Sequence, residues 1–324
     1  MPGLLAVFRK ELADHLGSKR LLILFAVIVL TALFATYVAR QSIAAEIRLG
    51  ASGNIPFAFL RLFTTSNDVL PPLVSFLIFF GPLMGLILAF DAINREQSSG
   101  TLSLVLAQPL FRDSVINGKF LAGVATISIM LLSIVLMVSG FGLYMLGVPP
   151  TFEEVLRIIA YLVVSIIYIS FWMALALLFS IFFIRITTSA MAAVGVWLFF
   201  ILFISMIAGV VADRVAPVML NPRTNEDLRL REAQQIRHDR IQQAIVRVSP
   251  VALYDEATFP ILIPSARSLA PVSTREQASM LPGPLPLRQS LIVAWPQLTS
   301  LIALTLICFA ISYVRFMRQE IRAP

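Results

Sequence analysis

Six apolar runs of membrane-spanning length constrain this chain more than any other feature of its sequence. A spanning helix needs about 20 predominantly apolar residues, because the hydrocarbon core of a bilayer is about 30 Å thick. The runs are residues 21–39, 73–90, 120–146, 158–184, 189–212 and 291–314. Only 13% of the residues are charged, whereas soluble domains carry about 25%. The sequence therefore predicts an all-α integral membrane protein with six transmembrane helices.

The segment before the first run, residues 1–20, is patterned as an amphipathic helix. Its apolar residues recur at near-helical spacing: Leu4, Leu5, Phe8, Leu12 and Leu16. Most of its charged residues lie off that stripe, which is typical of a helix in the membrane interface. A signal peptide is the alternative, with a weak cleavage-like site at residues 42–44. The first apolar run exceeds the usual 7–15 residues of a signal peptide, which favours the uncleaved helix.

The distribution of lysine and arginine predicts the orientation, because short cytoplasmic loops carry an excess of these residues. With the N-terminus inside, the basic residues of the cytoplasmic pieces are Arg9, Lys10, Lys19, Arg20, Arg95, Arg112, Lys119, Arg185, Arg315, Arg318 and Arg322. All lysines then lie on the cytoplasmic side. We therefore expect a multi-pass protein of the cell (inner or plasma) membrane, with both termini in the cytoplasm.

This orientation leaves one long segment, residues 213–290, outside the cell membrane. Residues 225–248 are charged and rich in glutamine, with a thin apolar edge, and predict a helix. After Ser249-Pro250 the chain is rich in proline, and prolines at this density exclude long helices and favour extended structure. We expect an extracytoplasmic cap, part helix and part extended, acting as a gate or as a contact for an extracytoplasmic protein. The remaining parts are then the helices of residues 21–212 and a last helix with its cytoplasmic tail, 291–324.

Between the second and third runs lies a cytoplasmic segment, residues 92–119, that is longer than a turn needs. It has a polar opening, an apolar helical piece, a stop at Pro109 and a second start at Gly118-Lys119. Its apolar residues Leu102, Val105 and Leu106 offer surface for a groove in a partner. By its residues alone, the segment fits a docking element and a partnerless interfacial helix about equally well.

The same segment carries a family resemblance. Its matching positions are Glu96, Gly100-Thr101-Leu102, Pro109, Arg112 and Gly118-Lys119. They resemble the coupling-helix region of ABC-2 type transporter permeases, and most closely the branch that includes the nitrous-oxide-reductase maturation permease (type V exporter-like). Ser249-Pro250 with Leu253-Tyr254 is a weaker similarity to the same branch. The resemblance extends to the six-span layout, the N-terminal amphipathic helix and the insertion before the last span.

The resemblance implies a permease subunit on which a separate ATPase docks. It implies docking residues Arg95, Glu96, Gly100, Thr101, Leu102, Val105, Leu106, Pro109 and Arg112, with Gly118 and Lys119 restarting the helix. In that branch two permease copies form a dimer above two ATPase subunits, so we expect a homodimer. ATP and magnesium would belong to the ATPase and no cofactor to this chain. Within the second run, Gly81 and Gly85 form a close-packing pattern that suggests a dimer contact.

The sequence lacks the motifs of the common catalytic sites. Gly118-Lys119 has neither the upstream glycine nor the hydroxyl residue of a phosphate-binding loop. The two histidines and the single cysteine are far apart, so no metal-ligand spacing is present. The arginines are scattered singly or in pairs, which argues against nucleic-acid binding. We therefore expect a transporter subunit rather than an enzyme, with no catalytic residue and no metal site.

The cargo is predicted only by class. Ionisable residues are nearly absent from the spans, and such residues mark ion and proton pathways. Serine, threonine and aromatic residues are present instead, and a path of this kind suits an amphiphilic or lipid-like cargo in contact with membrane lipid. The alternative is a mechanotransmitter or assembly scaffold for an extracytoplasmic protein, without cargo of its own. A membrane-embedded enzyme is a third hypothesis, against which the missing catalytic clusters argue.

Overall fold

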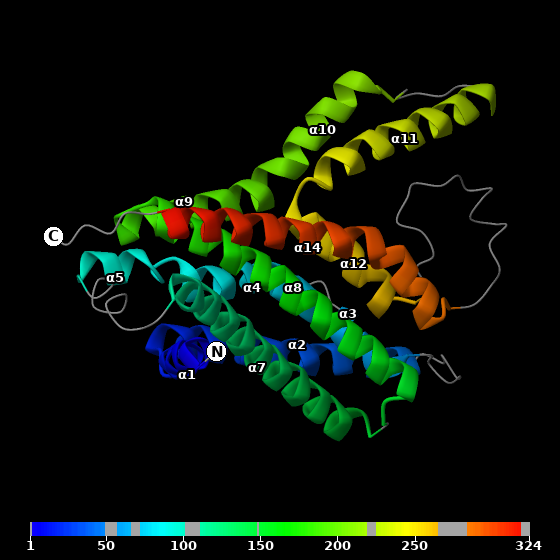
Figure 1. Ribbon diagram of the computed structural model, residues 1–324. Helices are drawn as coiled ribbons and strands as arrows, with labels where there is room; N and C mark the ends of the chain where they lie inside the picture. The colour runs from blue at the N-terminus through cyan, green and yellow to red at the C-terminus, as the bar shows by residue number, and fades with distance from the viewer. Residues whose placement is uncertain are drawn as a thin grey trace. The chain divides into compact units, whose positions relative to one another are not determined.

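The computed structural model describes residues 2–48, 57–65, 72–100, 111–147, 149–218, 225–264 and 284–318. Within these ranges the ordered elements are helices, and no strand occurs (Figure 1). The helices are α1 (Pro2–Leu16), α2 (Lys19–Arg48), α3 (Ala58–Thr64), α4 (Leu73–Ala89), α5 (Asn94–Ser98), α7 (Arg112–Leu146), α8 (Phe152–Phe182), α9 (Ile186–Leu198), the π-helix η1 (Phe199–Phe203), α10 (Ile204–Val215), α11 (Asn225–Val246), α12 (Pro250–Leu262) and α14 (Leu287–Arg318).

Six helical stretches of the described chain are long and apolar enough to cross a membrane. They are Lys19–Ile43, Leu73–Ser98, Arg112–Met145, Phe152–Phe182, Ile186–Val215 and Leu287–Arg318. Each contains most of one predicted apolar run, so the all-α fold and the six candidate spans are confirmed. Residues 2–16 form the predicted helix α1, while its place in the membrane interface stays a prediction.

The chain divides into two compact units, residues 1–194 with 299–324, and residues 195–298. In the first unit, α8 packs along α4, and α7 packs against α1, α2 and α8. The largest fully buried side chains of this unit include Trp172 and Tyr168 of α8. The Tyr168 hydroxyl donates a hydrogen bond to the carbonyl of Ile78 at 3.0 Å. Helix α8 is therefore the central element of the first unit.

The start of α8 is fixed by a capping box, which Thr151 and Glu154 form. The Thr151 hydroxyl accepts the Glu154 N–H at 3.3 Å, and the Thr151 N–H donates to Glu154 Oε2 at 2.8 Å. Glu154 Oε1 also accepts the backbone N–H of Phe59 at 2.9 Å. One buried carboxylate thus accepts backbone N–H groups at the starts of two helices, α8 and α3. These N–H groups have no acceptor within their own helices.

The second unit contains a helical hairpin, in which α11 packs against α10 (Figure 1). His238 of α11 lies 3.0 Å from Asp213 of α10, and this hydrogen bond raises the pKa of His238 above its ordinary value. Glu256 of α12 accepts two hydrogen bonds from Arg247 and one from Gln297 of α14. The predicted helix of residues 225–248 is therefore confirmed by α11.

The expectation of extended structure after Ser249-Pro250 is wrong for residues 250–262, which form the helix α12. Pro250 occupies the first turn, where its missing N–H has no helical acceptor to lose. The Ser249 hydroxyl caps the helix by accepting the N–H of Val251 at 3.2 Å. Pro260 lies two residues before the helix ends at Leu262, and Leu253 and Tyr254 are buried. Residues 265–283, which include Pro271 and Pro282, lie outside the described residues.

Candidate functional site

The predicted docking segment begins at a root, residues 90–98, that is hydrogen-bonded to two other helices. The Ser180 hydroxyl of α8 accepts the backbone N–H groups of Ile93 at 2.9 Å and Asn94 at 3.2 Å. The Ser189 hydroxyl of α9 donates to the carbonyl of Phe90 at 2.8 Å. Asn94 is completely buried. The root is therefore attached to the ends of the fourth and fifth spans before the segment leaves them.

On another side the root is held by a buried lysine. Lys119 of α7 lies 2.9 Å from Glu11 of α1 and 2.8 Å from Glu96 of α5, with its side chain only 6% exposed. Lys10 completes the group at 3.0 Å from Glu11. We call Lys10, Glu11, Glu96 and Lys119 the Lys119 cluster. It holds two positive and two negative charges, so each buried charge has an opposite partner, as burial requires.

The charges of the Lys119 cluster act on the titration of Glu11. Burial raises the pKa of Glu11, but the Lys119 ammonium and then Lys10 outweigh burial and hold that pKa below its ordinary value. Glu11 is therefore ionised near neutral pH. The cluster joins helices from three parts of the sequence: α1, α5 and α7.

Close backbone packing accompanies the ion pairs. A Cβ added at Gly118 would lie 2.8 Å from Cγ1 of Val7 and 3.4 Å from the carbonyl oxygen of Leu4. Only glycine therefore lets α7 approach α1 this closely beside Lys119. Gly118, expected to restart the helix, instead lies inside α7, which begins at Arg112.

A second charge group lies beside the first. Asp91 is 3.3 Å from Arg20 and 3.7 Å from Arg95. Both groups line one polar cavity of about 740 Å³, which His15 also lines. Burial lowers the pKa of His15 below its ordinary value. The cavity wall thus combines cations and carboxylates in nearly equal number.

The structure describes four of the nine predicted docking residues, and also the restart pair. Arg95 is exposed beside Asp91, while Glu96 is engaged with Lys119. Gly100 has a φ of +70°, a left-handed conformation that favours glycine, and Arg112 begins α7. Thr101, Leu102, Val105, Leu106 and Pro109 lie outside the described residues. The structure thus brings Glu96 and Lys119 together, and docking itself stays a prediction.

The glycine pair of the second span is buried against α8 of the same chain. A Cβ at Gly85 would lie 2.6 Å from the carbonyl oxygen of Ile169 and 2.8 Å from the nitrogen of Met173. A Cβ at Gly81 would lie 3.2 Å from the Ile169 side chain. The close packing made by these glycines is therefore within the chain. A dimer contact through them stays a prediction, and it would require α8 to move aside.

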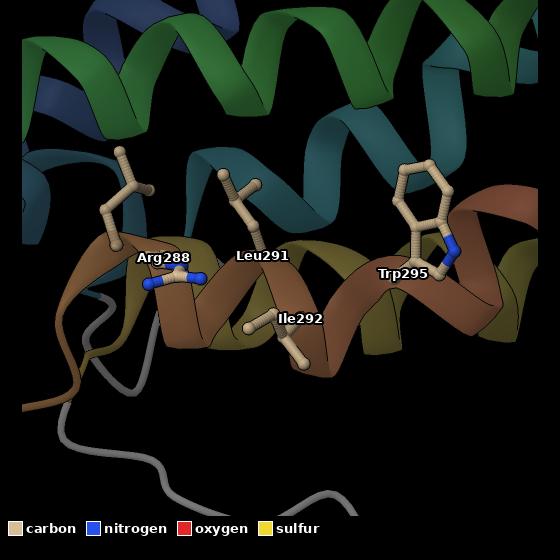
Figure 2. A pocket seen from close by; sticks show the side chains of 5 residues that line it. Arg288, Leu291, Ile292 and Trp295 are labelled. Atoms are coloured by element: carbon tan, nitrogen blue, oxygen red, sulfur yellow. The ribbon is translucent and has the colours of Figure 1, made fainter.

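An apolar groove of about 450 Å³ lies at the start of α14 (Figure 2). It is lined by Leu287, Arg288, Leu291, Ile292 and Trp295. Ile292 and Trp295 are each about three-fifths exposed. Arg288 has no ion-pair partner among the residues that the structure describes. The groove thus combines an apolar wall with one available positive charge.

Sequence reasoning did not single out Glu11, Asp91 or Ser180 as site residues. Ser180 was one of many hydroxyl residues that ordinary helix packing explains. Glu11 lies off the apolar stripe of α1 and has Lys119 as its partner 108 residues away. The sequence of α1 carries no local signal for that partner, because Glu11 is one of several charged residues off the apolar stripe.

Comparison with known proteins agrees with this architecture. The model of a family described as ABC-2 family transporter protein matches residues 5–321. A relative from Pseudomonas aeruginosa, named probable ABC transporter permease protein NosY, is 31% identical over 212 residues, which cover 64% of this chain and 70% of the relative. A protein of the same name from Stutzerimonas stutzeri is 37% identical over 114 residues, 35% of this chain and 36% of that relative's length. Because the family model covers nearly the whole chain, the protein belongs to the ABC-2 family of transporter proteins.

Proposed function

We propose that this permease is driven by a separate ATPase that docks on residues 92–119. Permeases of the ABC-2 family work with an ABC ATPase and often form dimers. Our proposal is a homodimer with two ATPase subunits, each holding ATP and Mg²⁺, and with both permease termini in the cytoplasm of a cell-membrane protein. Residues 213–290 then form a cap on the outer side.

The single observation that carries this proposal is the two-sided attachment of the root. Ser180 fixes Ile93 and Asn94 to α8, and Lys119 fixes Glu96 to α7. A displacement applied to the segment beyond residue 100 therefore reaches two spanning helices directly. A plain connector has no need of buried hydrogen bonds and ion pairs on both sides of its start.

Docking is tested by placing a charge on the apolar positions of the segment. Leu102→Asp and Leu106→Asp should each abolish co-purification with the cognate ATPase, because an unpaired buried charge costs several kcal/mol in an interface. Ser98→Asp is the matched control, since Ser98 is exposed on α5, and it should leave the complex intact. Undiminished recovery of the ATPase with both leucine variants would contradict docking at this segment.

For the cargo we propose an amphiphile that is exported or flipped between leaflets. The α14 groove supports this proposal, because an apolar wall beside Arg288 suits an acyl chain next to an anionic headgroup. The assay is ATP-dependent movement of a fluorescent anionic phospholipid in vesicles that contain the permease and ATPase. Movement that is equal with and without ATP would contradict the cargo proposal and leave the docking test unaffected.

A second candidate function is a mechanotransmitter or scaffold for an extracytoplasmic protein. It is favoured by α11, on which Arg229, Arg231, Arg237 and Arg240 are exposed and have no ion pair with other described residues. Reversing the charges of Arg229, Arg237 and Arg240 separates the two candidates. Lipid movement that survives the reversal favours the transporter, and loss of a co-purifying acidic protein without loss of lipid movement favours the scaffold.

A further inference from the structure

We infer that α1, the root of the docking segment and the start of α7 move as one rigid unit, with Lys119 as its positioning residue. This inference rests on the proposed function, because it concerns how the docked ATPase moves the permease. It adds a role for α1, which otherwise is only an interfacial anchor.

The first support is the geometry of the charges. Glu11 and Glu96 are bound by the same ammonium group, with Oε1 atoms 2.9 and 2.8 Å from Lys119 Nζ. The Glu11 and Glu96 side chains are only 10% and 17% exposed. A movement of α5 away from α1 would leave at least one buried charge without its partner, and such a state is strongly disfavoured.

The second support is the packing next to that lysine. The Val7 side chain of α1 fills the space where Gly118 has no side chain, so it packs directly on the backbone of α7. Ion pairs alone tolerate small rotations, whereas a close-packed contact does not. Together the two contacts fix both the distance and the rotation of α1 relative to α7.

The third support is the asymmetry between the two attachments of the root. The attachment to α8 and α9 consists of hydroxyl hydrogen bonds from Ser180 and Ser189. The attachment to α1 and α7 consists of charged, mostly buried pairs, and charged hydrogen bonds are shorter and roughly twice as strong as neutral ones. When the segment is displaced, α1 and α7 therefore follow it more closely than α8 does.

Rigidity is tested directly by a distance measurement in the full chain with Cys308→Ser. Spin labels are placed at the exposed positions Ala13 of α1 and Ser98 of α5. The distance between them should stay constant when the permease–ATPase complex passes from the nucleotide-free to the nucleotide-trapped state. A shift that exceeds the width of the distance distribution would overturn the inference.

The positioning role of Lys119 is separated from a merely structural role by two variants. Lys119→Met leaves the buried Glu11 and Glu96 carboxylates with only the exposed Lys10 as a cationic partner, so it should lower stability and broaden the label distance. The triple variant Glu11→Gln, Glu96→Gln and Lys119→Met removes all three charges together and should recover most of the stability. Arg9 is an exposed cation of α1 outside the cluster. Arg9→Met is therefore the control, and it should change neither the stability nor the label distance.

The deciding readout is the effect of the permease on the ATP hydrolysis rate of the bound ATPase. In the triple variant this effect should fall about tenfold, an ordinary size for a lost coupling between sites, while the ATPase still co-purifies. If the triple variant regains both stability and full coupling, Lys119 serves folding alone and the inference fails. Loss of co-purification in the wild-type chain would instead contradict the proposed docking, while the label distance still tests rigidity.

Discussion

Replacing Gly85 by alanine tests the packing of α4 on α8, around which the first unit is built. The added Cβ would lie 2.6 Å from the Ile169 carbonyl oxygen, 2.8 Å from the Met173 nitrogen and 3.0 Å from Cβ of Trp172. Favourable contact needs about 3.5 Å, so the two helices must separate by roughly 0.5–1 Å. Two of the three obstructing atoms are backbone and cannot rotate away.

The size of the effect follows from that separation. Overpacking of a close-packed interior typically costs about 1–3 kcal/mol, and moving α4 also strains the hydrogen bond from Tyr168 to Ile78. We therefore expect Gly85→Ala to lower the free energy of unfolding by about 2–3 kcal/mol. The measurement is thermal unfolding of the purified chain in detergent, together with its oligomeric state.

Gly140→Ala is the matched control, because Gly140 also lies within a spanning helix and a Cβ there meets nothing within 4 Å. It should leave stability unchanged or raise it slightly, since alanine favours helix more than glycine does. Equal melting temperatures of the two variants would refute the packing argument. A normal melting temperature with a lost dimer would assign the glycine pair to a contact between copies.

Three further predictions concern orientation, capping and pH. With Cys308 replaced, cysteines at Ser98 and Ser268 should react with a membrane-impermeant reagent from opposite sides of the membrane, and labelling from one side would overturn the topology. Glu154→Ala should lower stability by about 1–3 kcal/mol, because it removes the acceptor for backbone N–H groups of α8 and α3. Glu154→Gln should lower stability less than Glu154→Ala does, and an equal decrease for the two variants would show that Glu154 does not act as an acceptor. Because the pKa of Glu11 is depressed in the folded chain, its ionised form adds stability above the ordinary value of 4.5, and this contribution disappears as pH falls through the lower folded value. The melting temperatures of wild type and Glu11→Gln should therefore differ at pH 7 and converge as the pH falls from 4.5 through the lower folded pKa of Glu11, and a constant difference would contradict the pairing.

The spanning helices were predictable because their signal is local. A run of about 20 apolar residues has few folded alternatives in a bilayer other than a helix. The capping box at Thr151 and Glu154 was predictable for the same reason, since both partners lie within one turn. The helix α12 was missed because a proline is tolerated in the first turn and near the end of a helix. The number of prolines in a segment does not show whether they occupy those positions.

The partners of these helices were decided only by the tertiary structure. Glu96 and Lys119 were identified from the coupling pattern, but that pattern does not contain Glu11, which lies 108 residues from Lys119 and binds the same ammonium group. Likewise, the spacing of Gly81 and Gly85 indicates close packing without naming the helix that approaches. Periodicity gives the faces of a helix, whereas the face that meets another helix depends on how all the spans pack together. The sequence therefore determined the number and kind of spanning helices, and their packing decided that a buried lysine joins α1 to the docking segment.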